Sequence, residues 1–87
     1  DSTLAFWRSD ANGFPSNGGS AKAPASVGRI EKIDGPLELC GSRALHATMN
    51  PDVWQGERVW VVALHGEVQW ADDKCGALER EIVGEVL

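Results

Sequence analysis

The side chains with the most reactive chemistry in this chain are two cysteines and two histidines, at Cys40, His46, His65 and Cys75. A structural zinc site would need all four as ligands. Five residues separate the first cysteine from the first histidine, and nine separate the second pair. Zinc sites usually take their ligands from closely spaced pairs, so we expect no metal site and no cofactor. We interpret both cysteines as reduced, small buried hydrophobic residues, with a disulfide between them as the less favoured alternative.

His46 is the candidate catalytic residue, because it stands in the short motif Leu45–Thr48 (Leu-His-Ala-Thr). This motif resembles the first motif of ADP-ribosyltransferases, in which the histidine contacts the ribose of the nicotinamide cofactor. The resemblance implies an acidic partner for His46, which Glu79, Glu81 or Glu85 could supply. The family usually adds a tyrosine, and this chain has none. The alternative is a structural histidine that fixes a turn.

Charge is distributed unevenly along the chain. The net charge is −5, with a sum of +1 over residues 1–30 and −6 over residues 31–87. A nucleic-acid-binding surface needs clustered Lys and Arg, so direct nucleic-acid binding is not expected. No apolar run reaches the ~18 residues of a membrane span, and the first residues lack the pattern of a secretory signal. We therefore expect a cytoplasmic protein.

Acidic and aromatic residues together suggest a protein-binding surface. Trp60 and Trp70 alternate with polar residues in a way that predicts core positions, whereas Trp54 precedes a glycine and is expected to be the most exposed tryptophan. An exposed tryptophan beside carboxylates can anchor a protein contact. The predicted partner-binding residues are Trp54, Glu57, Glu67, Asp72, Asp73, Glu79 and Glu81.

Periodicity predicts an α+β fold in a single domain, residues 1–87, with a mostly antiparallel sheet of about five strands. The expected strands are 3–8, 27–33, 37–40, 58–64 with 67–70 as a hairpin, and 78–86. Residues 58–64 are apolar on both faces, which is typical of a strand covered on both sides. Asn50, Pro51 and Asp52 form a helix-start signature, so one short helix is expected near 50–56. Residues 9–25 are rich in Gly, Ser and Asn and are expected to form a flexible loop.

The C-terminal segment 78–86 fits both a strand and a helix. Its β-branched residues and Gly84 favour a strand, and we expect this strand to lie at a sheet edge, where it could pair across a homodimer.

Several segments together resemble a group of small proteins encoded by bacteriophages and prophages. They are residues 35–40 (Gly-Pro-Leu-Glu-Leu-Cys), 44–48, 54–68 (Trp-x-Gly-Glu-Arg-Val-Trp-Val-Val-Ala-Leu-His-Gly-Glu-Val), 73–74 and 80–82. The resemblance implies a phage accessory protein that acts in a bacterial host. We expect an inhibitor that binds a host protein complex, as anti-CRISPR proteins do, at a basic groove that otherwise holds nucleic acid. The alternatives are the small enzyme using His46 and a virion assembly protein.

Overall fold

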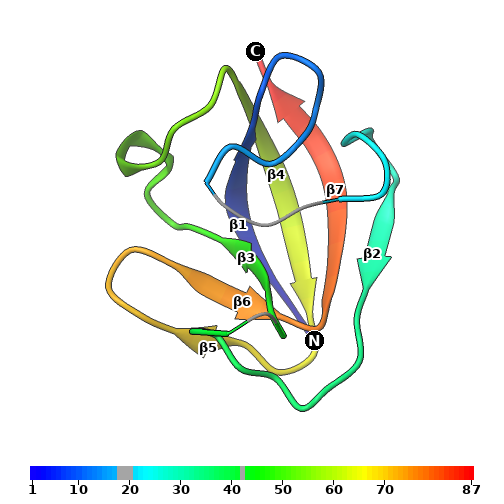
Figure 1. Ribbon diagram of the computed structural model, residues 1–87, viewed down its shortest axis with the longest axis vertical. Coiled ribbons are helices and arrows are strands. Elements are labelled where there is room, and N and C mark those ends of the chain that lie inside the picture. The colour runs from blue at the N-terminus through cyan, green and yellow to red at the C-terminus, as the bar shows by residue number, and fades with distance from the viewer. Residues whose placement is uncertain (18–20, 42) are drawn as a thin grey trace.

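The computed structural model describes residues 1–17, 21–41 and 43–87, and these residues form seven strands and one 3-10 turn. The strands are β1 (Ser2–Ser9), β2 (Ile30–Lys32), β3 (Leu45–Ala47), β4 (Arg58–His65), β5 (Gln69–Trp70), β6 (Cys75–Ala77) and β7 (Glu79–Val86). All pairings are antiparallel, in a large sheet of order β1-β4-β7-β2 and a small sheet of order β3-β6-β5 (Figure 1). The antiparallel sheet is confirmed, but the described chain is almost entirely β rather than α+β.

The predicted helix near 50–56 is wrong. Only η1 (Pro51–Val53) forms, as a single 3-10 turn that buries none of its residues and lacks a side-chain cap from Asn50. The chain is already extended at Trp54. A helix of this length needs an apolar face to stabilise further turns, and η1 has none. Gly56 then adopts φ +141°, and a Cβ at this position would lie 2.7 Å from the Ser9 carbonyl oxygen.

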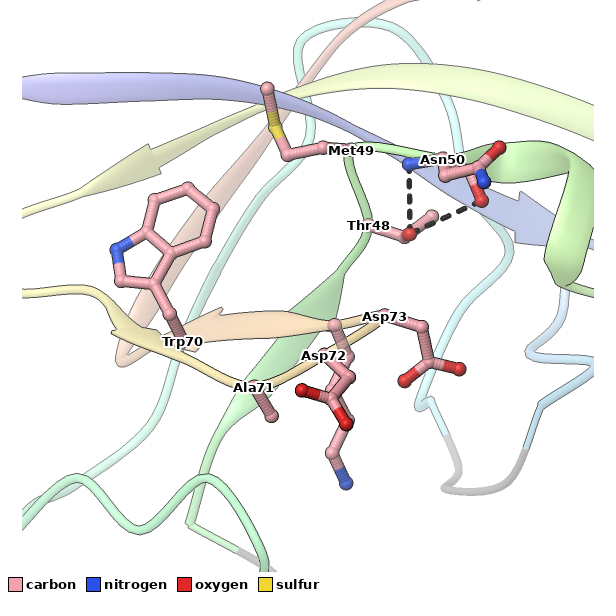
Figure 2. A pocket seen from close by; sticks show the side chains of 8 residues that line it. Thr48, Met49, Asn50, Trp70, Ala71, Asp72 and Asp73 are labelled. Atoms are coloured by element: carbon pink, nitrogen blue, oxygen red, sulfur yellow. Dashed lines mark hydrogen bonds between the residues drawn. The ribbon is translucent and has the colours of Figure 1, made fainter.

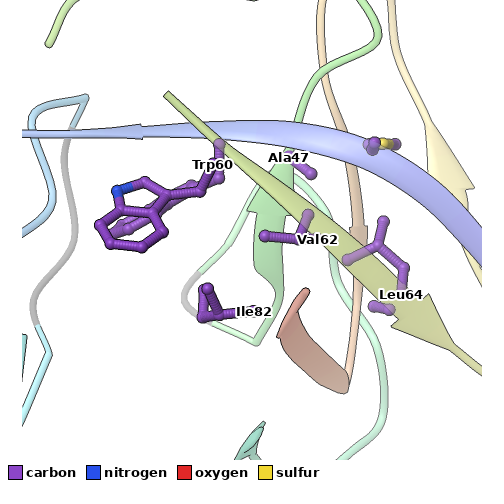
Figure 3. Packing of buried hydrophobic residues seen from close by; sticks show 9 residues of the cluster. Ala47, Trp60, Val62, Leu64 and Ile82 are labelled. Carbon is purple, nitrogen blue, oxygen red and sulfur yellow. The ribbon is translucent and has the colours of Figure 1, made fainter. Parts of the chain in front are cut away.

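The two sheets meet through a reciprocal pair of backbone hydrogen bonds between β1 and the residue that follows β3. The amide of Phe6 donates to the carbonyl of Thr48 at 2.8 Å, and the amide of Thr48 donates to the carbonyl of Phe6 at 2.8 Å. The small sheet thereby packs on one face of the large sheet, which we call the inner face. The core between them contains Ala5, Trp7, Trp60, Val62, Leu64 and Ile82 from the large sheet and Ala47, Cys75 and Ala77 from the small one (Figure 3).

The predicted hairpin of residues 58–64 and 67–70 is wrong, because β4 and β5 belong to different sheets. β4 instead pairs with β1 and β7. Gly66, at φ +80°, lies where the chain leaves the large sheet for the small one. The strand at 78–86 is confirmed as β7. Its expected edge position is wrong, because β7 lies between β4 and β2.

Residues 37–40 do not form the predicted strand. Glu38 makes an isolated bridge with Arg43, and Leu37, Leu39 and Ala44 form a second apolar cluster against Leu78. Gly76 of β6 lies directly under this segment, because a Cβ there would meet Leu39 Cδ1 at 2.9 Å and Ala44 Cβ at 3.0 Å. Leu39 and Ala44 therefore cover the face of the small sheet that points away from the core.

The start of the predicted flexible loop is held by hydrogen bonds. The Asp10 carboxylate accepts from the amides of Asn12 and Phe14, each at 2.9 Å, and the amide of Ala25 donates to Gly13 O at 2.9 Å. Residues 18–20 of this loop lie outside the described residues, and its flexibility stays a prediction. No helix among the described residues has the length and apolar character needed to cross a membrane.

Charged groups on the inner face of the large sheet are paired. Arg80 is 4% exposed, donates to Glu31 Oε1 at 2.6 Å and to the His46 carbonyl at 2.6 Å, and stacks on Trp7. Burial lowers the pKa of the Arg80 guanidinium, and the neighbouring Glu31 carboxylate opposes this shift. The inner face thus holds an ion pair that is almost wholly removed from water.

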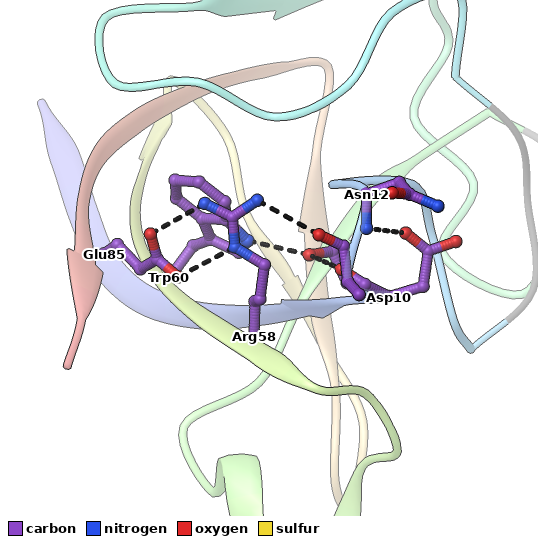
Figure 4. A network of polar contacts seen from close by, with 7 residues as sticks. Asp10, Asn12, Arg58, Trp60 and Glu85 are labelled. Carbon is purple, nitrogen blue, oxygen red and sulfur yellow. Dashed lines mark hydrogen bonds and ion pairs between the residues drawn. The ribbon is translucent and has the colours of Figure 1, made fainter.

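At the other end of the inner face, Arg58 makes a two-pronged ion pair with Glu85, with both N–O distances 2.8 Å (Figure 4). The guanidinium also lies 4.5 Å from the centroid of the Trp60 ring, whose Nε1 donates to Ser9 Oγ at 2.9 Å. Hydrogen bonds from Arg58 hold the pKa of Glu85 below its ordinary value. The Trp60 indole and the Arg58 guanidinium therefore both have defined partners, whereas Nε of the buried Arg80 on the same face has no hydrogen-bond partner among the described residues.

Candidate functional site

Two adjoining hollows lie beside the turn that joins β5 to β6, and together we call them the β5–β6 groove. The smaller hollow has a volume of about 90 Å³ and is lined by Thr48, Met49, Asn50, Trp70, Ala71, Asp72, Asp73 and Lys74 (Figure 2). The larger has a volume of about 340 Å³ and is lined by Asn17, His46, Val53, Trp54, Asp73 and Lys74. Asp73 and Lys74 border both hollows, so a single ligand could contact both.

Trp70 is the most prominent side chain of the groove and is 56% exposed. The predicted core position for this residue is wrong, although the register shows that its side chain points to the predicted side of the small sheet. Trp70 pairs with Cys75, which is fully buried. β5 has only two residues and lies at the outer edge of the small sheet, beyond the reach of the large sheet. The indole therefore extends past the core, and Figure 2 shows it rising toward Met49.

The prediction that Trp54 is the most exposed tryptophan is wrong, because its side chain is only partly exposed. It packs against the main core cluster while still lining the larger hollow. The wall beside it is fixed by Asn17, whose side-chain amide donates to Gln55 O at 2.6 Å and whose side-chain carbonyl accepts from Gln55 N at 2.9 Å. This double contact joins the 9–17 loop to the segment after η1.

The groove has two carboxylates and one ammonium group. Asp72 and Asp73 are exposed, and the structure records no ion pair for either among the described residues. The turn that presents them is closed by a hydrogen bond from the amide of Ala71 to the carbonyl of Lys74 at 2.8 Å. In Figure 2 the two carboxylates project from the side of the turn opposite to the Trp70 ring.

His46 lines the larger hollow, but one of its ring nitrogens has a structural partner. Nε2 lies 2.8 Å from the carbonyl oxygen of Leu39. A carbonyl can only accept, so Nε2 carries a proton and donates. Gln69 holds the same segment, since its side chain donates to Leu37 O at 3.1 Å and accepts from Leu39 N at 2.9 Å. His46 thus helps to hold residues 37–39 on the small sheet, which is a structural role but not the predicted one of fixing a turn.

The glutamates that could have partnered His46 lie elsewhere. Glu79 and Glu81 are on the face of the large sheet opposite the small sheet, where Glu79 pairs with Lys32 at 3.7 Å and Glu81 with His65 at 3.0 Å. Glu85 pairs with Arg58. The carboxylate that lines the hollow beside His46 is Asp73.

The structure brings together only part of the predicted binding surface. Trp54, Asp72 and Asp73 meet at the groove. Glu57 is exposed just before β4, and Glu67 is exposed between β4 and β5. The groove residues that the sequence interpretation missed are Trp70 and Met49, both more than half exposed. The signal for Trp70 is its place directly before the turn residues Ala71 to Lys74, at the end of a strand.

The two cysteines have contrasting environments. Cys75 is fully buried in the core, as predicted, and burial raises the pKa of its thiol. Cys40 is exposed, so the prediction of a buried residue is wrong for it, and both thiols are free. No group of three or more His, Cys, Asp or Glu side chains arranged to hold a metal ion occurs in the part of the chain that the structure describes.

Comparison of the chain with protein-family models, with curated proteins and with solved structures gives no match. The geometry of the site is therefore the basis for a functional proposal.

Proposed function

We propose that this chain is a binding module that docks a basic protein surface at the β5–β6 groove. The observation that carries the proposal is the exposed Trp70 indole next to a turn that presents two carboxylates with no recorded ion pair among the described residues. Large amphipathic aromatic side chains dominate the energetics of protein interfaces.

The charge of the groove indicates the chemistry of the partner. Asp72 and Asp73 outnumber Lys74, and the chain as a whole has a net charge of −5. Complementary charge speeds encounter and rejects partners of the same sign. A protein surface rich in Lys and Arg is the complementary partner, and surfaces of this kind commonly hold nucleic acid.

The biological setting that we propose follows from the resemblance to phage-encoded proteins. In that setting, the chain is an accessory protein that acts in the cytoplasm of a bacterial host and inhibits a host complex by occupying its basic groove, in the manner of an anti-CRISPR protein. The acidic residues of the groove support this role.

The test is affinity capture from bacterial lysate at low ionic strength, with the wild type beside three variants. We expect Trp70→Ala and the double variant Asp72→Asn/Asp73→Asn to lose a stoichiometric partner that the wild type retains. Glu57→Gln removes an exposed carboxylate away from the groove and serves as the matched control. Raising the salt from about 50 mM to about 500 mM should release the partner, because the attraction between exposed charges is screened. A partner that both groove variants retain would contradict the proposal.

A second candidate function is the small ADP-ribosyltransferase-like enzyme. It is favoured by one observation, that His46 lines a hollow of about 340 Å³ beside the Trp54 ring, which is within the usual range of ligand pockets. Titration of the wild-type protein with a nicotinamide dinucleotide tests it directly. Saturable binding that quenches tryptophan fluorescence would favour the enzyme, whereas no binding at millimolar cofactor would remove it.

A further inference from the structure

The face of the large sheet opposite the small sheet is largely apolar, and we call it the outer face. The strand register brings Leu4 of β1, Ala63 of β4, Glu81 of β7 and Ile30 of β2 into one row, with Phe6 and Val61 in the next row and Val59 and Val86 in the row after. Val83 is the extra residue of a β-bulge in β7 and is also exposed. Leu4 and Ile30 are 60% and 56% exposed. An antiparallel sheet normally has a polar face toward water, so this face departs from the usual pattern.

The same conclusion follows from β4 alone. Its residues are apolar on both faces, which predicts cover on both sides. The small sheet covers Trp60, Val62 and Leu64, whereas on the other side the described residues bury Ala63 but leave Val59 and Val61 partly exposed. We propose that a second copy of this chain covers the outer face, so that two large sheets stack face to face in a symmetric homodimer.

Charge selects a second copy as the occupant. The charged residues at one end of the outer face are already paired within the chain, Lys32 with Glu79 and His65 with Glu81. The two acidic residues of the face, Glu79 and Glu81, are balanced by the basic residues Lys32 and Arg8, so two copies can approach there despite their net charge of −5 each. A highly basic partner would find no carboxylate on this face without a partner of its own.

Two copies stacked on this face about a two-fold axis would form an isologous interface, and interfaces of this type close as dimers.

The size of the face sets the expected strength of the dimer. Four strands spaced about 4.8 Å apart, with a rise of about 3.4 Å per residue, form a face of roughly 500 Å² per copy. Specific interfaces bury about 1,200–2,000 Å² in total, and weaker complexes fall below this range. The dimer should therefore dissociate in the micromolar range.

Sedimentation velocity of the wild type from about 1 µM to about 500 µM, a range chosen around that micromolar expectation, tests the proposal. We expect a monomer at the low end and a dimer at the high end. Leu4→Lys and Val86→Lys place a charge on residues already exposed in one copy, so they should keep the fold and weaken association at least tenfold. Met49→Lys is the matched control, because Met49 is as exposed as Leu4 but lies at the β5–β6 groove. It should leave association unchanged, and circular dichroism at low concentration checks that all three variants fold.

Two results would overturn the proposal. One is a wild type that stays monomeric over the whole range. The other is a dimer that survives both outer-face substitutions, since another surface would then join the copies. The proposal is independent of the function assigned to the groove, because the outer face and the small sheet lie on opposite sides of the large sheet.

Discussion

The inner face of the large sheet and the β5–β6 turn use the same residue types in opposite ways. On the inner face, Trp60 is 2% exposed, its indole donates to Ser9, and Arg58 above it pairs with Glu85. At the turn, Trp70 is mostly exposed, and Asp72 and Asp73 have no recorded ion pair among the described residues. Side chains whose polar groups find partners within the chain are typical of a structural region, whereas carboxylates without a recorded ion pair are typical of a binding region.

Substitution of Trp60 on the inner face should cause the largest loss of stability. Trp60→Ala removes a buried indole, its hydrogen bond to Ser9 and its stacking with Arg58. We expect the free energy of unfolding to fall by about 3–5 kcal/mol, the range for truncating a large buried aromatic residue. Urea unfolding followed by circular dichroism measures it. A loss below about 1 kcal/mol would show that this region is not the core.

The buried ion pair should have the next largest effect. Glu31→Gln leaves the Arg80 guanidinium buried without its counter-charge, and removing one partner of such a pair costs about 3 kcal/mol or more. Glu79→Gln is the control, because its contact with the exposed Lys32 ammonium is 3.7 Å long and such surface pairs contribute at most about 1 kcal/mol. Equal losses for the two variants in urea unfolding would contradict the difference in burial.

The stability contributed by the ion pair between Arg58 and Glu85 should be lost in acid. The folded-state pKa of Glu85 lies below the ordinary value of 4.5, so its stabilising contribution is present above that value and is lost as the pH falls through the folded-state pKa. The urea midpoint of Glu85→Gln should be lower than that of the wild type at pH 7 and should approach it as the solution is acidified below 4.5. Glu57→Gln, where the structure records no ion pair, should show no such convergence.

The smallest effect on stability is expected at Trp70. Trp70→Ala removes a ring that is mostly in water, so the free energy of unfolding should change by no more than about 0.5 kcal/mol. Partner capture should nevertheless be lost. A large loss of stability in thermal unfolding would show that this indole belongs to the core after all.

The sequence predicted strands well where they are long. β1, β4 and β7 follow segments of eight residues with β-branched and aromatic side chains, and each was expected within about one residue. Short strands were harder to predict. β3 and β6 have three residues each, and their Ala and Gly residues have low β-propensity, so pairing with each other stabilises them rather than local preference.

The candidate site was predicted only in part, for a related reason. Alternation along the strand predicts the side of the small sheet to which Trp70 points. It does not predict how far the large sheet extends on that side, and this decides how exposed the indole is. Similarly, the helix-start residues at 50–52 are present, yet no apolar face follows them. Which acidic residues share a surface depends on strand order, and the non-sequential order β1-β4-β7-β2 cannot be read from local periodicity.

The joint between Phe6 and Thr48 has a consequence for local unfolding. These two hydrogen bonds continue the backbone pairing from the large sheet into the small one, whose three strands are otherwise short and contribute the small residues Ala47, Cys75 and Ala77 to the core. Regions with few buried apolar contacts open first. Amide protons of β3, β5 and β6 should therefore exchange with solvent sooner than those of β4 and β7. The small sheet, which carries the β5–β6 turn, can then unfold locally while the large sheet stays folded.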